Sequence, residues 1–293
     1  MLAVKRRVHY ELEYHYVATN GIRLHVVQCG PEDGPLVVLL HGFPEFWYAW
    51  HQQLHPLAAA GYRVWAPDQR GYNLSDKPQR VADYRIDTLA RDILGLLDAA
   101  GQRQAFIVGH DWGAAVAWHL ATHYPERVRK VAVLNVPHPS VLFRTLRRSA
   151  EQLRKSWYIL FFQLPWLPEW LVRRRSWWYG RQALLRTSRR GTFSTADLAE
   201  YVVAWQQPRA MHSMINWYRA ALRTPHQPAG TARVTVPVHI IWGVKDAFLK
   251  REMAEHSFLL CDQAQLTYLP ASHWVQHEEA EAVNTLLLRF FEV

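Results

Sequence analysis

The stretch GHDWGA, at residues 109–114, places a single carboxylate among small residues directly after the apolar run QAFIV. A turn that projects one side chain forward between a strand and a helix is strained, so it needs small residues on both sides. Gly109, Gly113 and Ala114 meet that need, and Asp111 is the projected group. An aspartate that merely caps the helix would not require the flanking glycines. The pattern therefore predicts a nucleophilic carboxylate at Asp111, favoured by the amino terminus of the helix behind it.

A nucleophile of this kind needs a base and a group that orients the base. Asp246 follows the apolar run VPVHIIWG, and His273 follows the run AQLTYLP. The order nucleophile, acid, histidine along the chain is that of a known type of catalytic triad. An imidazole with an unperturbed pKa of about 6.5 can take a proton from water at neutral pH when a carboxylate holds it. A helix-capping Asp246 and a solvent-facing His273 are the alternatives, but the joint placement of both residues after strands favours the triad.

The segment HGFP, at residues 41–44, could complete such a site. A backbone turn after a strand can aim the N–H of Phe43 at a developing oxyanion, and the N–H of Trp112 is a second candidate donor. We predict that these two amides form the oxyanion hole. His41 is expected to be a structural hydrogen-bonding residue rather than a catalyst.

The elements that would position these residues alternate between strands and helices. Asn20-Gly21 predicts a tight turn within a hairpin at 16–28. A stripe of apolar residues predicts a helix at 87–101. The alternation predicts an α/β fold with a mostly parallel, doubly wound sheet, in which reactive groups gather at the carboxyl ends of the strands. The further strands are expected at residues 36–40, 62–68, 104–109, 128–136, 236–243 and 264–270.

The positive charge is concentrated in the middle of the chain. Of the 293 residues, 49% are hydrophobic and 20% are charged, and the net charge is +9. Residues 138–230 hold 15 Lys and Arg but only 4 Asp and Glu, and they are rich in tryptophan. The strand pattern stops at this segment and resumes near Val234. We therefore predict a core domain formed by residues 1–137 and 232–293, with an inserted helical cap at 138–231.

The motifs HGFPEFWYAW, DQRGYNLSDKP, GHDWGA, WGVKDAF and SHWVQHE, in this order, resemble the epoxide hydrolases of the α/β-hydrolase superfamily. The resemblance implies the α/β-hydrolase fold, with a helical cap inserted after the sixth strand. It also implies two cap tyrosines that hydrogen-bond the epoxide oxygen. Tyr158 and Tyr218 stand in the matching motifs, SWYILFFQLP and INWYRAAL. The alternative is that both tyrosines only pack in the cap, as Tyr179 and Tyr201 are expected to do.

The resemblance implies a hydrolase that needs no cofactor or metal and converts a small hydrophobic epoxide and water to a vicinal diol, for detoxification or lipid signalling. A serine that opened an epoxide would form an ether, which water does not readily cleave. Asp111 would instead form an ester, which water activated by His273 could hydrolyse. Haloalkane dehalogenases share this chemistry and are the alternative, but Phe43 stands where they usually carry a second halide donor. A ligand receptor on a hydrolase fold is a further alternative, which the intact triad disfavours.

Composition also bears on location and assembly. We find no leader-like segment and no transmembrane run in the sequence, and Cys29 and Cys261 form no spaced framework. A cytoplasmic protein without disulfides is therefore expected. A homodimer is one expected assembly.

Three further patterns have both a functional and a structural interpretation. His119 and His123 have the spacing of metal ligands but lack an evident third partner, so packing or exposure is expected. The Arg-rich cap, with RRR at 173–175, is expected to be a solvated surface rather than a nucleic-acid site. The segment FFQLPWLPEWLV, at 161–172, could face a membrane or a partner, or pack against the core.

Overall fold

The computed structural model describes residues 10–223 and 233–292. The strands in these residues form one sheet in the order β1-β2-β4-β3-β5-β6-β7-β8. β1 pairs antiparallel with β2 and β2 with β4, and the other neighbours are parallel. This confirms the predicted α/β fold with a mostly parallel, doubly wound sheet. The strands are β1 (Glu13–Thr19), β2 (Ile22–Cys29), β3 (Leu36–Leu40), β4 (Arg63–Pro67), β5 (Ala105–His110), β6 (Val128–Leu134), β7 (Val238–Gly243) and β8 (Ala264–Leu269).

The β1–β2 turn has the backbone that its sequence predicts. Asn20 has a φ of 42° and Gly21 a φ of 77°. Two successive positive φ values are what a two-residue hairpin turn of this kind requires, and the Asn-Gly pair tolerates them. The hairpin therefore forms as expected, between β1 and β2.

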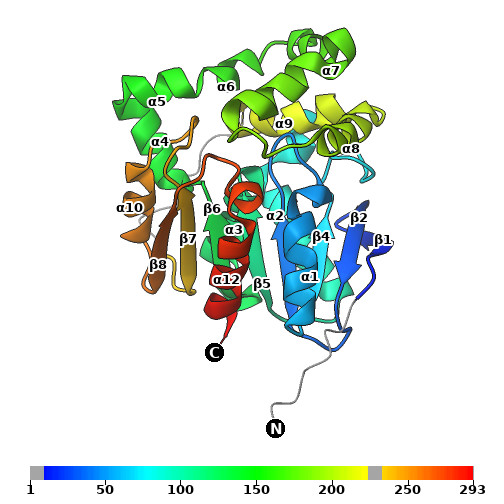
Figure 1. Cartoon of the computed structure of the whole chain (residues 1–293), viewed down its shortest axis with the longest axis vertical. Coiled ribbons are helices and arrows are strands. Elements are labelled where there is room, and N and C mark those ends of the chain that lie inside the picture. Colours follow the sequence, from blue (N-terminus) through cyan, green and yellow to red (C-terminus); the bar gives the residue numbers. More distant parts are fainter. Residues whose placement is uncertain (1–9, 224–232, 293) are drawn as a thin grey trace.

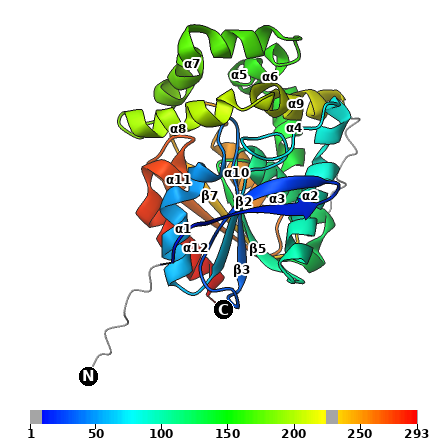
Figure 2. The same ribbon diagram turned by 90° about the vertical axis from the view of Figure 1, so that its right-hand side faces the viewer.

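The run of five aliphatic residues in β3 separates two apolar layers. Leu36, Val38 and Leu40 lie in the cluster that includes α2 and α3, whereas Val37 and Leu39 lie in the cluster that includes α1 and α12. Successive side chains of a strand point to opposite faces, so a strand with helices on both sides is apolar throughout. Figure 2 shows helices on both sides of the sheet. The core helices are α1 (His51–Ala59), α2 (Ile86–Ala99), α3 (Trp112–His123), α10 (Glu252–Phe258), α11 (Val275–Glu278) and α12 (Ala280–Phe291), and the short 3-10 helices are η1 (Trp47–Trp50), η2 (Val81–Tyr84) and η3 (Pro125–Arg127).

Six helices lie between β6 and β7 in the described part of the chain, and we call them the cap. Figure 1 shows the cap above the sheet, on the side where β6 leads into α4. The predicted boundaries, with the core at 1–137 and 232–293 and the cap at 138–231, stay a prediction, since residues 224–232 lie outside the described residues. None of the described helices is long and apolar enough to cross a membrane. The cap helices are α4 (Pro139–Arg148), α5 (Ala150–Lys155), α6 (Trp157–Phe161), α7 (Leu167–Thr187), α8 (Thr195–Gln206) and α9 (Ala210–Arg223).

Buried tryptophans of the cap hydrogen-bond to backbone carbonyls of the core. The indole N–H of Trp205 donates to Pro44 O at 2.6 Å, and that of Trp217 donates to Arg70 O at 2.9 Å. A buried indole contributes a large apolar surface and needs an acceptor for its single donor. The two loops that follow β3 and β4 supply these acceptors, so the cap is fixed above the carboxyl ends of the strands.

Candidate active site

Asp111 stands at a sharp turn between β5 and α3. Its φ of 47° and ψ of −120° lie in a region that L-residues rarely adopt. A Cβ on Gly113 would overlap the backbone oxygen of Leu40, and a Cβ on Gly42 would overlap the Asp111 side chain. The small residues therefore let the loop after β3 and the start of α3 approach the carboxylate from both sides.

The two carboxylate oxygens of Asp111 face different partners. Oδ1 accepts a hydrogen bond of 2.7 Å from the Phe43 N–H, whereas Oδ2 lies 3.6 Å from His273 Nε2. Burial raises the pKa of Asp111, but the nearby charge of His273 and the hydrogen bond from the Phe43 N–H leave that pKa below its ordinary value. Asp111 is therefore ionised at neutral pH, with one oxygen held by an amide and the other directed toward the imidazole.

His273 lies between two carboxylates. Its Nδ1 is 2.7 Å from Asp246 Oδ2. Asp246 is itself fixed, because Asn135 Nδ2 donates to Oδ2 at 2.7 Å and the Phe248 N–H donates to Oδ1 at 2.7 Å. Burial lowers the pKa of His273, but the charge of Asp246, the hydrogen bond to Asp246 and the nearby charge of Asp111 raise it to about 10. Asp246 thus orients the imidazole, and the two ionised carboxylates together hold it in the cationic form.

Tyr158 on α6 and Tyr218 on α9 lie above the loop and turn that hold the carboxylate. Their ring centroids are 5.9 Å apart, and the Tyr218 ring is 5.0 Å from that of Trp112 and 5.3 Å from that of Phe43. Burial raises the pKa of both phenols, and the charge of Asp111 raises it further. Both hydroxyl groups therefore stay protonated at neutral pH and can donate.

The sequence-predicted site residues meet in one region of the fold. The N–H of Trp112 lies in the first turn of α3, next to Asp111, and no hydrogen bond joins it to the carboxylate in the described structure. Its part in an oxyanion hole stays a prediction. The residues brought together are Phe43, Asp111, Trp112, Tyr158, Tyr218, Asp246 and His273.

A buried carboxylate that the sequence analysis did not single out lies behind His273. Glu45 Oε1 accepts a hydrogen bond of 2.8 Å from Tyr201 and lies 2.7 Å from His277 Nε2. Its Oε2 is 3.1 Å from His110 Nδ1, and His110 Nε2 is 2.9 Å from the backbone oxygen of His273. Tyr201, which was expected only to pack, therefore connects cap helix α8 to the residues that contact the backbone of His273.

The charge of Glu45 is balanced inside this cluster. Burial raises its pKa, but the charge of His277 and the hydrogen bonds from His110 and His277 lower that pKa below the ordinary value. The sequence did contain local indications, because Glu45 directly follows HGFP and His110 directly precedes Asp111. Neither position in the sequence predicts that Glu45 contacts Tyr201 and His277, which come from elements far along the chain.

The weaker candidates have structural roles or none related to this site. His41 is fully buried, and its Nε2 accepts a hydrogen bond of 3.0 Å from the Gln69 N–H. His119 and His123 stack with ring centroids 4.0 Å apart, and His119 Nε2 is 2.9 Å from Asp87. Among the described residues, no group of three or more His, Cys, Asp or Glu could hold a metal ion.

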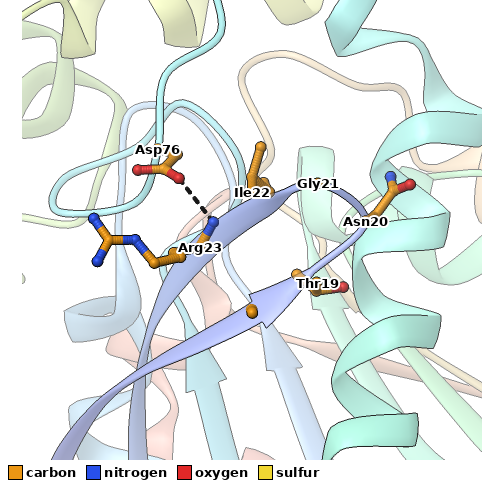
Figure 3. A pocket seen from close by; sticks show the side chains of 7 residues that line it. Thr19, Asn20, Gly21, Ile22, Arg23 and Asp76 are labelled. Atoms are coloured by element: carbon orange, nitrogen blue, oxygen red, sulfur yellow. Dashed lines mark hydrogen bonds between the residues drawn. The ribbon is translucent and has the colours of Figure 1, made fainter.

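A surface pocket of about 460 Å³ lies at the tip of the β1–β2 hairpin (Figure 3). The Arg23 N–H donates to Asp76 Oδ2 there at 2.8 Å. The pocket contains no pair of a nucleophile and a base, and β4 and β3 separate β2 from the strand that carries Asp111. This pocket therefore offers no alternative to the candidate site under the cap.

Comparison with known proteins identifies similar chains over almost the whole length. The family described as "alpha/beta hydrolase fold" matches residues 35–280. The "AB hydrolase superfamily protein YfhM" of Bacillus subtilis is 47% identical over 94% of this chain and 97% of that protein. "Epoxide hydrolase 4" of Homo sapiens is 38% identical over 95% of this chain and 78% of that protein. A crystal structure of a Bacillus megaterium epoxide hydrolase with an inhibitor superimposes with a TM-score of 0.86 at 30% identity, covering 95% of this chain and 100% of that one.

Proposed function

Because the chain belongs to the α/β-hydrolase family and, within it, to the epoxide hydrolases, we propose that it adds water to an apolar epoxide and releases a vicinal diol. One observation carries the proposal. The Asp111 carboxylate has Oδ1 on the Phe43 N–H and Oδ2 toward His273, below two protonated phenols. This arrangement supports roles for Asp111 as nucleophile, for His273 as base and for the two phenols as proton donors.

In the first proposed step, Asp111 Oδ2 attacks an epoxide carbon. The ring C–O bond breaks, and its electron pair moves to the epoxide oxygen, which takes a proton from Tyr158 or Tyr218. An alkoxide is a poor leaving group unless it is protonated, so the phenols act where charge develops. Oδ1, held by the amide of Phe43, becomes the carbonyl oxygen of the resulting ester.

In the second proposed step, water hydrolyses the ester at the Asp111 Cγ. Nε2 of His273 takes a proton from the water, and Asp246 holds the imidazolium through Nδ1. The tetrahedral intermediate carries its negative charge on Oδ1, where the Phe43 N–H already donates and the Trp112 N–H is the proposed second donor. The intermediate collapses by breaking the bond between Cγ and the diol oxygen, which takes the proton from His273. Asp111 is then a carboxylic acid that passes its proton to the neutral His273, so the carboxylate and the imidazolium of the resting site are restored. The phenol is reprotonated from solvent.

The proposed substrate is small and hydrophobic, because the side chains around the carboxylate are aromatic. Phe43, Phe162 and Tyr218 form mutual edge contacts with centroids 4.9–5.3 Å apart. Haloalkane dehalogenation is the less favoured alternative, since the Phe43 ring offers no hydrogen bond to a leaving halide. The predictions of a cytoplasmic location, a homodimer and no nucleic-acid partner remain part of the proposal.

The experiment uses the base-deficient variant His273→Ala, which should form the ester but not hydrolyse it. After incubation with an aryl epoxide, intact and peptide mass spectrometry should find an adduct of the whole epoxide mass on the Asp111 peptide. The matched control adds Asp111→Ala to the same variant and should remain unmodified. An adduct formed only with a haloalkane would move the assignment to dehalogenation, and no adduct from a panel of epoxides would overturn the proposal.

A further inference from the structure

The outer helices of the cap expose several large apolar side chains that lie close together in the sequence. Figure 1 shows α5, α6 and α7 along the part of the cap farthest from the sheet. Spacings of four, three and four residues, typical of one helical face, separate the first four side chains of the series. The series, which we call the outer cap face, comprises Leu153 (53% exposed), Trp157 (62%), Leu160 (60%), Leu164 (43%), Trp166 (71%) and Trp170 (49%).

The outer cap face is not left over from packing of the cap. The same helices bury a second, inward face, in which Gln152 Nε2 donates to Phe248 O at 2.7 Å and Phe162 is 7% exposed. Tyr158 also lies on this inward side, between Phe248 and Tyr218. A short helical segment with one apolar face inside and another in water is unusual for a protein surface, because contiguous exposed apolar patches usually mark an interaction site.

The charged residues in the segment that carries the outer cap face are mostly basic. Residues 144–175 contain eight Lys or Arg and two Glu. Glu169 is buried against Arg219 at 2.8 Å, and Glu151 is 2.9 Å from Lys250, so both acidic side chains of this segment are paired. The exposed basic side chains are Arg144, Arg147, Arg148, Arg154, Arg173, Arg174 and Arg175.

This combination of chemistry favours a lipid surface over the other large partners. The Arg174 guanidinium lies 4.5 Å from the centre of the Trp170 ring. Tryptophan and arginine together suit the headgroup region of a bilayer, where the indole is half-buried and the guanidinium meets phosphate. Leu153, Leu160 and Leu164 could enter the acyl boundary, whereas aliphatic side chains neither stack on bases nor bind nucleic-acid phosphates.

We propose that the outer cap face docks this protein peripherally on anionic bilayers. The proposal of docking is independent of the proposed function, and only its consequence for substrate delivery rests on that function. α6 carries Trp157 and Leu160 outward and Tyr158 inward. A docked enzyme would therefore hold its substrate-binding cap against the phase in which apolar epoxides accumulate.

The test is flotation of the full chain with vesicles of phosphatidylcholine, alone or mixed with phosphatidylglycerol. The wild type should float with the mixed vesicles at low salt and less at about 0.15 M salt, where surface charges are screened. Trp157→Ala combined with Trp166→Ala should weaken binding at least tenfold. Replacement of the three arginines at 173–175 by Gln should weaken it about a hundredfold, since each basic side chain near an anionic surface contributes roughly fivefold.

Leu259→Gln is the matched control, because Leu259 is 66% exposed but follows α10 in the core. It should bind vesicles as the wild type does, and all variants should keep their melting temperature and their turnover of a water-soluble epoxide. Absence of wild-type binding to the mixed vesicles, or equal binding by the tryptophan variant, would overturn the proposal. The proposal would also be overturned if the wild type were a dimer that does not bind vesicles and the tryptophan variant were a monomer. Vesicle binding without turnover of any epoxide would refute the proposed function but leave the docking surface intact.

Discussion

Replacing Asp246 with Asn separates the two chemical steps, and the structure indicates why. Oδ1 of Asp246 accepts hydrogen bonds from the N–H groups of Phe248 and Leu249, at 2.7 and 3.0 Å. Two backbone donors at Oδ1, against the single side-chain donor of Asn135 at Oδ2, favour the amide oxygen of the asparagine at the Oδ1 position. The amide NH₂ then takes the place of Oδ2 and points at His273 Nδ1.

An NH₂ group opposite Nδ1 requires that nitrogen to accept, so the imidazole proton moves to Nε2. Nε2 faces Asp111 and is the atom that must take a proton from water. In a serine-protease triad, the same Asp-to-Asn change lowers kcat about 10⁴-fold because the wrong tautomer is held. We expect ester hydrolysis to slow by about a thousandfold or more, which corresponds to about 4 kcal/mol of activation free energy.

Ring opening does not use His273 as a base, so it should slow by less than about tenfold. The assay is rapid mixing of Asp246→Asn with excess aryl epoxide, with formation and loss of the ester followed by intact mass. The ester should appear at a rate close to that of the wild type and then persist. Equal slowing of formation and hydrolysis, or hydrolysis at the wild-type rate, would refute the tautomer argument.

The remaining predictions concern the donors, the charge of the base and the support of the cap. Tyr158→Phe and Tyr218→Phe should each slow ester formation about 10²-fold, and together more than either alone, in single-turnover kinetics, with hydrolysis of a preformed ester unchanged. The raised pKa of His273, from 6.5 to about 10, stabilises the folded state fully below pH 6.5 and loses this effect as the pH rises toward 10. Urea unfolding at several pH values should therefore show a difference between wild type and His273→Gln that shrinks over this range. Arg219→Met should lower the free energy of unfolding by about 3 kcal/mol, because the buried carboxylate of Glu169 loses its guanidinium partner. Arg219→Lys should recover part of that loss of stability.

The sequence predicted those parts of the site that depend on local backbone geometry. Gly113 permits the turn at Asp111, because a Cβ on residue 113 would overlap the backbone of Leu40. A requirement for glycine of this kind can be recognised in the sequence. Asp246 and His273 follow apolar runs, and parallel strands bring their carboxyl ends to one edge of the sheet. The strand pattern was therefore enough to predict that these residues meet.

The buried Glu45 cluster could not be predicted in this way. Tyr201 comes from α8 in the cap, and His277 comes from α11 after the last strand. No periodicity or spacing links these elements, since their proximity arises only when the cap packs on the loop after β3. The same reason applies to the outer cap face, because an apolar stripe in sequence does not reveal which of two faces is covered.

The order of the two chemical steps follows from charge balance around His273. With both carboxylates free, Asp111 and Asp246 hold a proton on the imidazole, whose pKa is raised to about 10. In that state the imidazole cannot act as a base, but none is needed for attack by an ionised Asp111. Esterification removes the Asp111 charge, which is 3.6 Å from Nε2, and so lowers the pKa of His273, although the charge of Asp246 still raises it. A lower pKa favours loss of the Nε2 proton to solvent, so we expect the imidazole to be a better base once the ester has formed. A carboxylate nucleophile therefore changes the pKa of the neighbouring imidazole when it reacts. An uncharged serine hydroxyl in the same position could not do this.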